Sequence, residues 1–95
     1  MTLCLIQSAC RHYNISMDDF RKGRKRSHAD ARRVVMLLLM RSGICSSYAQ
    51  IGIVLNISKQ RAYSGVKAIE TLEQYDKGTQ AAIAALRELR FLQMS

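Results

Sequence analysis

The sequence contains no proline, and only five of its 95 residues are glycine. An all-β chain needs many turns, which these two residue types commonly form, so their scarcity argues against that class. Alanine, leucine, methionine, arginine and glutamine favour helix instead. The composition therefore predicts an all-α protein, and the length corresponds to one domain, residues 1–95, with one modest core.

Cysteine is scarce as well, because the chain has only Cys4, Cys10 and Cys45. An odd number without a CxxC pair predicts neither a disulfide framework nor a zinc site, and Cys4 and Cys10 are expected to pack as small apolar residues. The longest apolar run, 34–40, is far shorter than the roughly 20 residues of a membrane span. The first ten residues lack the basic leader of a signal peptide. We therefore expect a cytoplasmic protein with no metal, cofactor or small-molecule substrate.

Acidic residues are few, since 7 Asp and Glu stand against 15 Lys and Arg and the formal net charge is +8. Such an excess favours nucleic acid or another anionic surface as partner. The densest run is 21–26 (RKGRKR), which holds five cations. These cations repel one another, so we expect a basic loop over 21–27. Alone, such a run fits a nuclear signal, a lipid-binding patch, an RNA-binding stretch, a DNA-contacting arm or solvated surface.

Helical spacing and capping residues predict six helices in a compact bundle. The first three expected elements are a helix over 2–13 ended by Asn14, a short turn of helix capped by Ser16, and a helix that runs from a capping box at Ser27 and Asp30 to about 41. A short helix capped by Ser47 and a helix over 59–75 capped by Ser58 follow. After a break at 77–79, a last helix begins at 79 or 80 and runs to about 93. Residues 34–40 are apolar on all faces, so the helix that contains them is expected at the centre.

Residues 48–67 fit a helix-turn-helix, a unit expected over about 47–75. Gly52 is the small residue at which the two helices can approach, Asn56 tolerates the left-handed turn, and Ser58 caps the second helix. The second helix would present to DNA the residues Ser58, Lys59, Gln60, Arg61, Tyr63, Ser64 and Lys67. Such side chains reach phosphates and base edges in the major groove. The other interpretation is a plain helical hairpin with a solvated cationic face.

A basic loop beside a helix-turn-helix can enter the minor groove, where arginine is favoured. The residues predicted to contact the minor groove or phosphates are Arg21, Lys22, Arg24, Lys25, Arg26, Arg32 and Arg33. The sequence therefore predicts a double-stranded DNA-binding protein whose two cationic clusters straddle one duplex.

The order of short motifs strengthens this prediction. The chain carries HYNIS, DDF, RKRS, QIG and KAIETL in that order, and it resembles the C-terminal, DnaA-box-binding domain of the bacterial replication initiator DnaA over roughly residues 3–92. The matching positions are Tyr13, Ile15, Asp18, Phe20, Lys22, Arg24, Arg26, Ser27, Arg32, Leu38, Ile51, Gly52, Ile69, Glu70 and Leu72.

The resemblance implies a six-helix domain in which Arg24 enters the minor groove and Lys22, Arg26 and Arg32 lie near phosphate. The chain departs from the family at 57–62 (ISKQRA), where the family has a stretch close to RDHTTV, so its recognition helix would read another sequence or read little. No GxxxxGK[ST] motif is present. A transcription or replication regulator without ATPase activity is therefore expected, associated with the nucleoid.

Several alternatives remain. The basic face could bind an acidic protein instead of DNA, as a DnaA-like decoy or inhibitor. RNA binding is weakened by the lack of exposed aromatic pairs. We expect no enzymatic activity, and His28 is interpreted as a helix-start residue near DNA. The last helix is expected to bury Ile83, Leu86 and Leu89, and its end, 91–94, could contact a partner or a second copy, although a monomer is the default.

Overall fold

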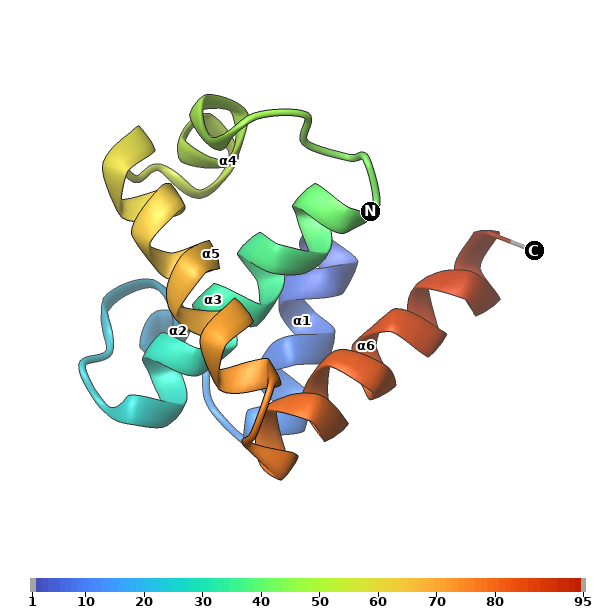
Figure 1. Ribbon diagram of the computed structural model, residues 1–95. Coiled ribbons are helices and arrows are strands. Elements are labelled where there is room, and N and C mark those ends of the chain that lie inside the picture. The colour runs from blue at the N-terminus through green and yellow to red at the C-terminus, as the bar shows by residue number, and fades with distance from the viewer. Residues whose placement is uncertain (1, 95) are drawn as a thin grey trace.

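The computed structural model describes the backbone of residues 2–94 and the side chains of residues 2–88. It contains six helices, and no strand occurs between residues 2 and 94. The helices are α1 (Thr2–Tyr13), α2 (Met17–Lys22), α3 (Arg26–Arg41), α4 (Tyr48–Leu55), α5 (Lys59–Glu73) and α6 (Lys77–Met94) (Figure 1). The predicted all-α fold is confirmed. No helix within the described part of the chain is long and apolar enough to cross a membrane.

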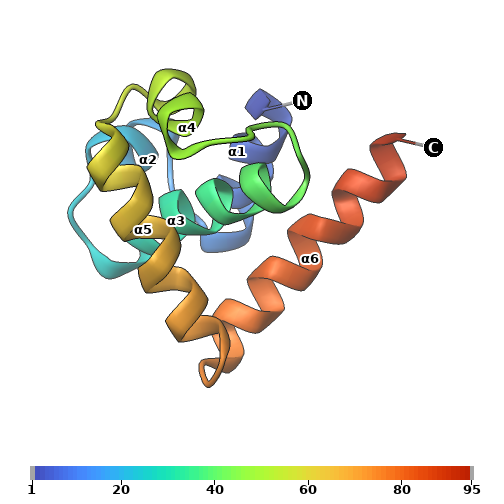
Figure 2. The same cartoon turned by 45° about the horizontal axis from the view of Figure 1, so that its top comes forward.

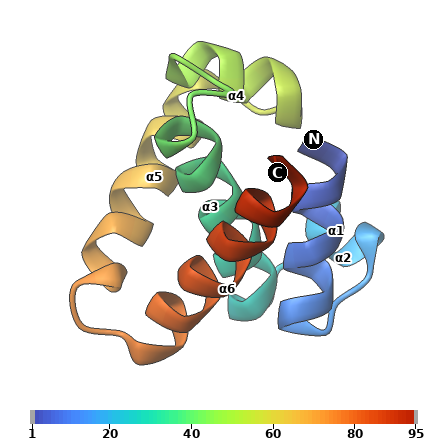
Figure 3. The ribbon, with the colours of Figure 1, turned by 90° about the vertical axis from the view of Figure 1, so that its right-hand side faces the viewer.

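Helix α3 forms the centre of the bundle, as its apolar run predicted. It contacts each of the other five helices, and the turned view shows it enclosed by them (Figure 3). Every residue of the range 34–39 is buried. A helix with apolar side chains on all faces is stable in water only when other elements cover those faces. The single core cluster accordingly takes residues from all six helices.

The first two helices begin and end where local sequence predicts. Asn14 has a φ of 55°, the left-handed conformation that ends α1. Ser16 then caps α2, because its hydroxyl accepts from the backbone N–H of Asp19 at 3.0 Å while the Asp19 carboxylate accepts from the N–H of Ser16 at 3.3 Å. This reciprocal pair is a capping box. The bonds from Ser16 hold the pKa of Asp19 below its usual value.

The predicted basic loop over 21–27 is too long. Arg21 and Lys22 are the last residues of α2, Arg26 is the first of α3, and only residues 23–25 connect the two helices. The capping box predicted at Ser27 is also wrong, because Lys25 is the N-cap and makes no side-chain capping bond. Tertiary packing explains the short connection: a Cβ on Gly23 would collide with the imidazole ring of His28, so the backbone at Gly23 packs directly against the first turn of α3.

The boundary between α5 and α6 also differs from the prediction. Helix α5 ends at Glu73 rather than 75, and α6 begins at Lys77 rather than at 79 or 80. The carboxylate of Asp76 accepts from the N–H and the hydroxyl of Thr79, at 3.0 and 2.6 Å. Thr79 is therefore a first-turn residue held by an aspartate cap, and residues 77–79 start the helix instead of breaking the chain.

Helix α6 lies across the bundle from α4 and diverges from α5 after the tight turn between them (Figure 2). It contacts α1, α3 and α5, and Ile83 and Leu86 are buried as predicted. The predicted burial of Leu89 and the predicted partner contact of 91–94 concern side chains that lie outside the described residues. At the end of α5 that leads into the turn before α6, the guanidinium of Arg41 donates to both carboxylate oxygens of Glu73, at 2.9 and 2.6 Å, and this pair joins α3 to α5.

Candidate nucleic-acid interface

The segment predicted as a helix-turn-helix consists of α4, the turn at residues 56–58 and α5. The Ser47 hydroxyl caps α4 by accepting from the N–H of Gln50 at 3.2 Å, and Ser58 caps α5 by accepting from the N–H of Arg61 at 3.1 Å. Asn56 has a φ of 58°, the left-handed conformation predicted for the turn. The bond from the N–H of Ile57 to the carbonyl of Gly52 is 2.9 Å long. These local predictions are confirmed.

Gly52 is required by the turn itself. A Cβ at this position would lie 2.6 Å from the carbonyl oxygen of Ile57, a distance that real Cβ atoms essentially never show. Ile51 is fully buried beneath the turn, and Ala62 is fully buried on α5. The sequence therefore fixes how closely α5 lies to α4, because only glycine allows the turn backbone to sit on this helix.

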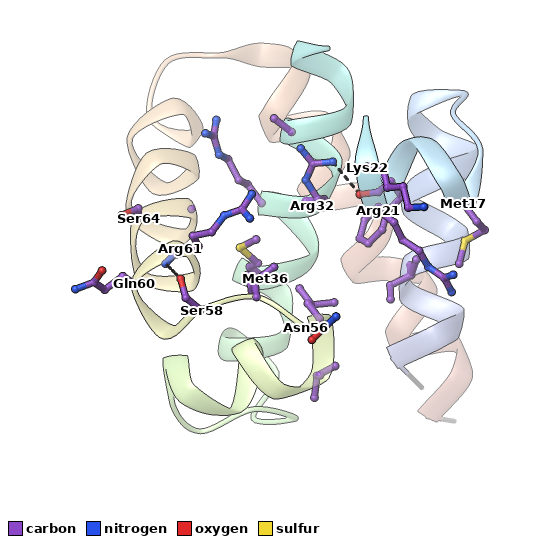
Figure 4. A pocket seen from close by; sticks show the side chains of 18 of the residues that line it. Met17, Arg21, Lys22, Arg32, Met36, Asn56, Ser58, Gln60, Arg61 and Ser64 are labelled. Carbon is purple, nitrogen blue, oxygen red and sulfur yellow. Dashed lines mark hydrogen bonds between the residues drawn. The ribbon is translucent and has the colours of Figure 1, made fainter. Parts of the chain in front are cut away.

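A groove of about 940 Å³ lies between this unit and the first two helices. Figure 4 shows α5 on one side, the side chains of α2 on the other, and α3 between them. The polar lining residues are Arg21, Lys22, Arg32, Arg33, Asn56, Ser58, Gln60, Arg61 and Ser64. The other lining residues are Leu3, Ile6, Met17, Phe20, Ala29, Met36, Val54, Leu55, Ile57 and Gly65.

The groove is strongly cationic, because its lining holds five Arg or Lys residues and no Asp or Glu. Arg21 and Lys22 come from α2, whereas Arg61 comes from α5. Members of the two predicted cationic clusters, far apart in sequence, therefore line one groove. Such a concentration of like charge without a counter-charge attracts anions.

Arg32 has a structural role in addition to its charge. Its Nη1 donates to the carbonyl oxygen of Phe20 at 2.9 Å, at the end of α2 (Figure 4). It also donates to the carbonyl oxygen of Asp19 at 3.4 Å, which accepts from the N–H of Gly23 as well. Burial lowers the pKa of Arg32 from its ordinary value, and the nearby charges of Arg61 and Arg33 lower it further. Arg32, predicted as a phosphate contact, thus holds α2 against α3 with part of its guanidinium.

The remaining cations of the run 21–26 do not line the groove. Arg24 and Lys25 are exposed in the short connection, so both are accessible. Arg26 lies in the first turn of α3, where its Nε is 3.7 Å from the Asp30 carboxylate. Its side chain is 76% exposed, so this weak surface pair leaves Arg26 accessible to an anion.

The residues predicted on α5 divide into two groups. Gln60, Arg61 and Ser64 line the groove together with the capping residue Ser58, and the Gln60 side chain extends from its rim (Figure 4).

The second group on α5, Lys59, Tyr63 and Lys67, lies outside the groove lining and is exposed. The Tyr63 ring packs edge-to-face on that of Tyr48, with centroids 5.1 Å apart, and Nζ of Lys67 lies 5.6 Å from the Tyr63 centroid. These contacts fix Tyr63 on the outer side of α5.

The predictions for two single residues need correction. His28 lies in the first turn of α3, as predicted, but its side chain is buried rather than exposed toward DNA: its Nε2 lies 3.8 Å from the Asp19 carboxylate, and its Nδ1 has no hydrogen-bond partner among the described residues. Gly23 lets the chain cover it. Cys4 is exposed and does not pack in the core, whereas Cys10 and Cys45 are buried. All three are free cysteines, and no group of three metal-ligating side chains forms within residues 2–88.

Sequence reasoning missed the apolar part of the groove. Val54 is 45% exposed and Leu3 is 57% exposed, and both line it. A signal for this was present: the run 53–55 places three apolar residues in succession on a short amphipathic helix, which cannot turn all of them to the core.

Within the described residues, the protein is an all-α bundle of six helices with a cationic groove beside α5. No protein-family model matches the chain, and no curated protein or solved structure matches it.

Proposed function

We propose that the protein binds double-stranded DNA, with α5 in the major groove and the connection between α2 and α3 at the minor groove, and acts as a transcription or replication regulator without ATPase activity. The observation that carries the proposal is the set of five cations, unaccompanied by any carboxylate, that α2, α3 and α5 contribute to one groove. Its resemblance to the DnaA C-terminal domain agrees with this assignment. The proposal implies a cytoplasmic, nucleoid-associated protein.

The proposed complex contains two kinds of contact, to phosphates and to base edges. Arg21, Lys22 and Arg33 line the groove, whose described lining contains no carboxylate, and in the proposed complex they contact phosphates. Such contacts supply affinity but no sequence information.

Base reading is assigned to the start of α5. Gln60 and Arg61 occupy its first turn, the part of a recognition helix that meets base edges. Glutamine pairs bidentately with adenine and arginine with guanine. Arg24, exposed in the short connection, is assigned to the minor groove, where a narrow A·T-rich segment concentrates negative potential.

Titration of the protein into fluorescent random-sequence duplex at several salt concentrations tests the proposal. Five to seven phosphate contacts should give a slope of log affinity against log salt of roughly −5 to −6. Undetectable binding at low salt would reject DNA binding and favour the protein-interaction alternative.

Selection of duplexes from a random pool then provides a cognate site. Gln60→Ala or Arg61→Ala should weaken binding to this cognate site by about 1–3 kcal/mol. Gln60→Ala should weaken binding to random duplex much less. Lys59→Ala, on the same turn but outside the groove lining, is the matched control and should act equally on both duplexes. Equal losses for Gln60→Ala on both would show that this residue does not read bases.

A further inference from the structure

The groove has a second part that the proposed function does not use. Six apolar side chains that are not fully buried, from α1, α2, α4 and the turn after α4, also line it, and we call them the apolar part: Leu3, Ile6, Met17, Val54, Leu55 and Ile57. Ile6, Met17, Leu55 and Ile57 are half-buried against the core. Leu3 and Val54 are the exposed members, at 57% and 45%.

Exposed apolar side chains that gather in a concave site differ from scattered ones. Ile53 is 81% exposed but lies outside the groove, and single exposed residues of this kind are ordinary. Leu3 and Val54, in contrast, belong to helices distant in sequence and share one groove. Binding grooves characteristically combine apolar side chains with a small number of polar or charged groups. The phosphate backbone of DNA offers it no apolar partner.

We propose that the groove also docks an acidic segment of a partner protein that carries apolar side chains. Its carboxylates would lie against Arg21, Lys22 and Arg61, and its apolar side chains would contact Leu3 and Val54. Charge complementarity supports this occupant, because no carboxylate of this chain lines the groove. An acidic amphipathic segment matches both parts at once, in the manner of a helix that lays its apolar face into a groove.

The inference goes beyond the proposed function but shares its cations. Arg61 would serve both partners, so the acidic segment and the duplex should exclude one another. Such competition would let an acidic protein release this chain from DNA. Docking itself does not depend on DNA binding, so the two proposals can fail separately.

A fluorescent amphipathic peptide of about 15 residues, with leucines at i, i+3 and i+7 and glutamates between them, is the probe. Its binding to the full chain is followed by fluorescence anisotropy. Two control peptides are used: in the first, serine replaces the leucines, and in the second, glutamine replaces the glutamates. We expect the first replacement to weaken binding at least about tenfold, because it removes the apolar contacts, and the second to abolish binding.

Variants of the protein separate the groove from general surface charge. The double variant Leu3→Ser/Val54→Ser should weaken peptide binding about tenfold and leave the affinity for random duplex within about twofold. Ile53→Ser, a neighbour on the same helix outside the groove, is the matched control and should change neither. All three positions are exposed, and a circular dichroism melt verifies that each variant folds. Unlabelled duplex should displace the peptide from the unmodified protein.

The inference is overturned if the serine peptide binds as well as the leucine peptide, or if Leu3→Ser/Val54→Ser and Ile53→Ser behave alike, because attraction between net charges would then explain the binding. It is also overturned if Leu3→Ser/Val54→Ser weakens the binding of phosphatidylglycerol vesicles but does not weaken the binding of the peptide. Peptide binding of the expected kind without any duplex binding supports the docking site and rejects the proposed DNA-binding function.

Discussion

Nη1 of Arg32 lies 2.9 Å from the carbonyl oxygen of Phe20 and donates a hydrogen bond to it, across twelve positions of sequence. This bond occupies a carbonyl that α2 leaves free at its end. It also attaches the helix that carries Arg21 and Lys22 to the centre of the bundle. The geometry of one groove wall therefore depends on an arginine whose charge faces the same groove.

The first prediction concerns this bond. Arg32→Met should lower the free energy of unfolding by about 1–2 kcal/mol, because a charged donor to buried carbonyls is lost. Arg33→Met, the adjacent substitution, removes the same charge from the groove and should change stability by less than about 0.5 kcal/mol. Urea unfolding measures both. Equal stabilities of the two variants would show that the bond to Phe20 contributes nothing.

A second prediction concerns the groove charges. Under the proposed function, Arg21→Gln should reduce the salt slope of duplex binding by about 0.9, the value for one phosphate contact. Arg87→Gln, an exposed position on α6 outside the groove, removes the same charge from another surface and should leave the slope unchanged. If both variants lower affinity equally, net charge rather than the groove attracts the duplex.

The third prediction uses two glycines with opposite surroundings. Gly52→Ala should destabilise the protein by about 1–3 kcal/mol, because the new methyl group would meet the Ile57 carbonyl at 2.6 Å. Gly78→Ala should stabilise it by up to about 1 kcal/mol, because the nearest atom is 3.6 Å away and alanine favours the first turn of α6. Thermal unfolding compares the two, and a stabilising Gly52→Ala would contradict the close approach described above.

The fourth prediction concerns acid. The hydrogen bonds from Arg41 hold the pKa of Glu73 below its ordinary value. A carboxylate whose pKa is lowered by folding contributes stability above its unfolded pKa and loses it as the pH falls through the folded pKa. Glu73→Gln should therefore reduce stability by about 1 kcal/mol at neutral pH and by almost nothing at strongly acidic pH. Glu88→Gln, on exposed α6 surface, should give no such convergence in melts recorded across the acid range.

The fifth prediction concerns alkali. Burial raises the pKa of Tyr13 from 10.0 to about 12, and the charges of Asp30 and Asp76 add to the effect. Because the folded state disfavours the phenolate, the contribution of Tyr13 is complete below its unfolded pKa and disappears as the pH rises through its folded value. Ultraviolet titration should show a phenolate transition near pH 12 that Tyr13→Phe removes. If the transition near pH 12 persists in Tyr13→Phe, the assignment of this transition to Tyr13 is contradicted.

Local sequence rules predicted most of the helices correctly, and particular residues show why. Asn14, Ser16, Ser47, Asn56 and Ser58 each act on backbone groups within a few residues, so their roles are readable from neighbours in sequence. The rules failed where a distant element intervened.

Ser27 illustrates such a failure. It has the sequence of a helix cap, but α3 begins at Arg26, and the packing of Gly23 against His28 fixes the connection there. The sequence analysis did not predict Asp76 as the cap of α6, because the residues that follow it, 77–79 (KGT), suggest a break in the chain.

The sequence alone determined the all-α class, the apolar helix at the centre and the turn of the helix-turn-helix, because caps, turns and periodicity act over one or two helical turns. Tertiary structure alone decided which cations share a groove. It brought Arg21 and Lys22 to the same groove as Arg61, left Arg24 and Lys25 outside its lining, paired Arg26 with Asp30 and buried His28. The surroundings of a charged side chain depend on helices remote in sequence, and only their packing brings these together.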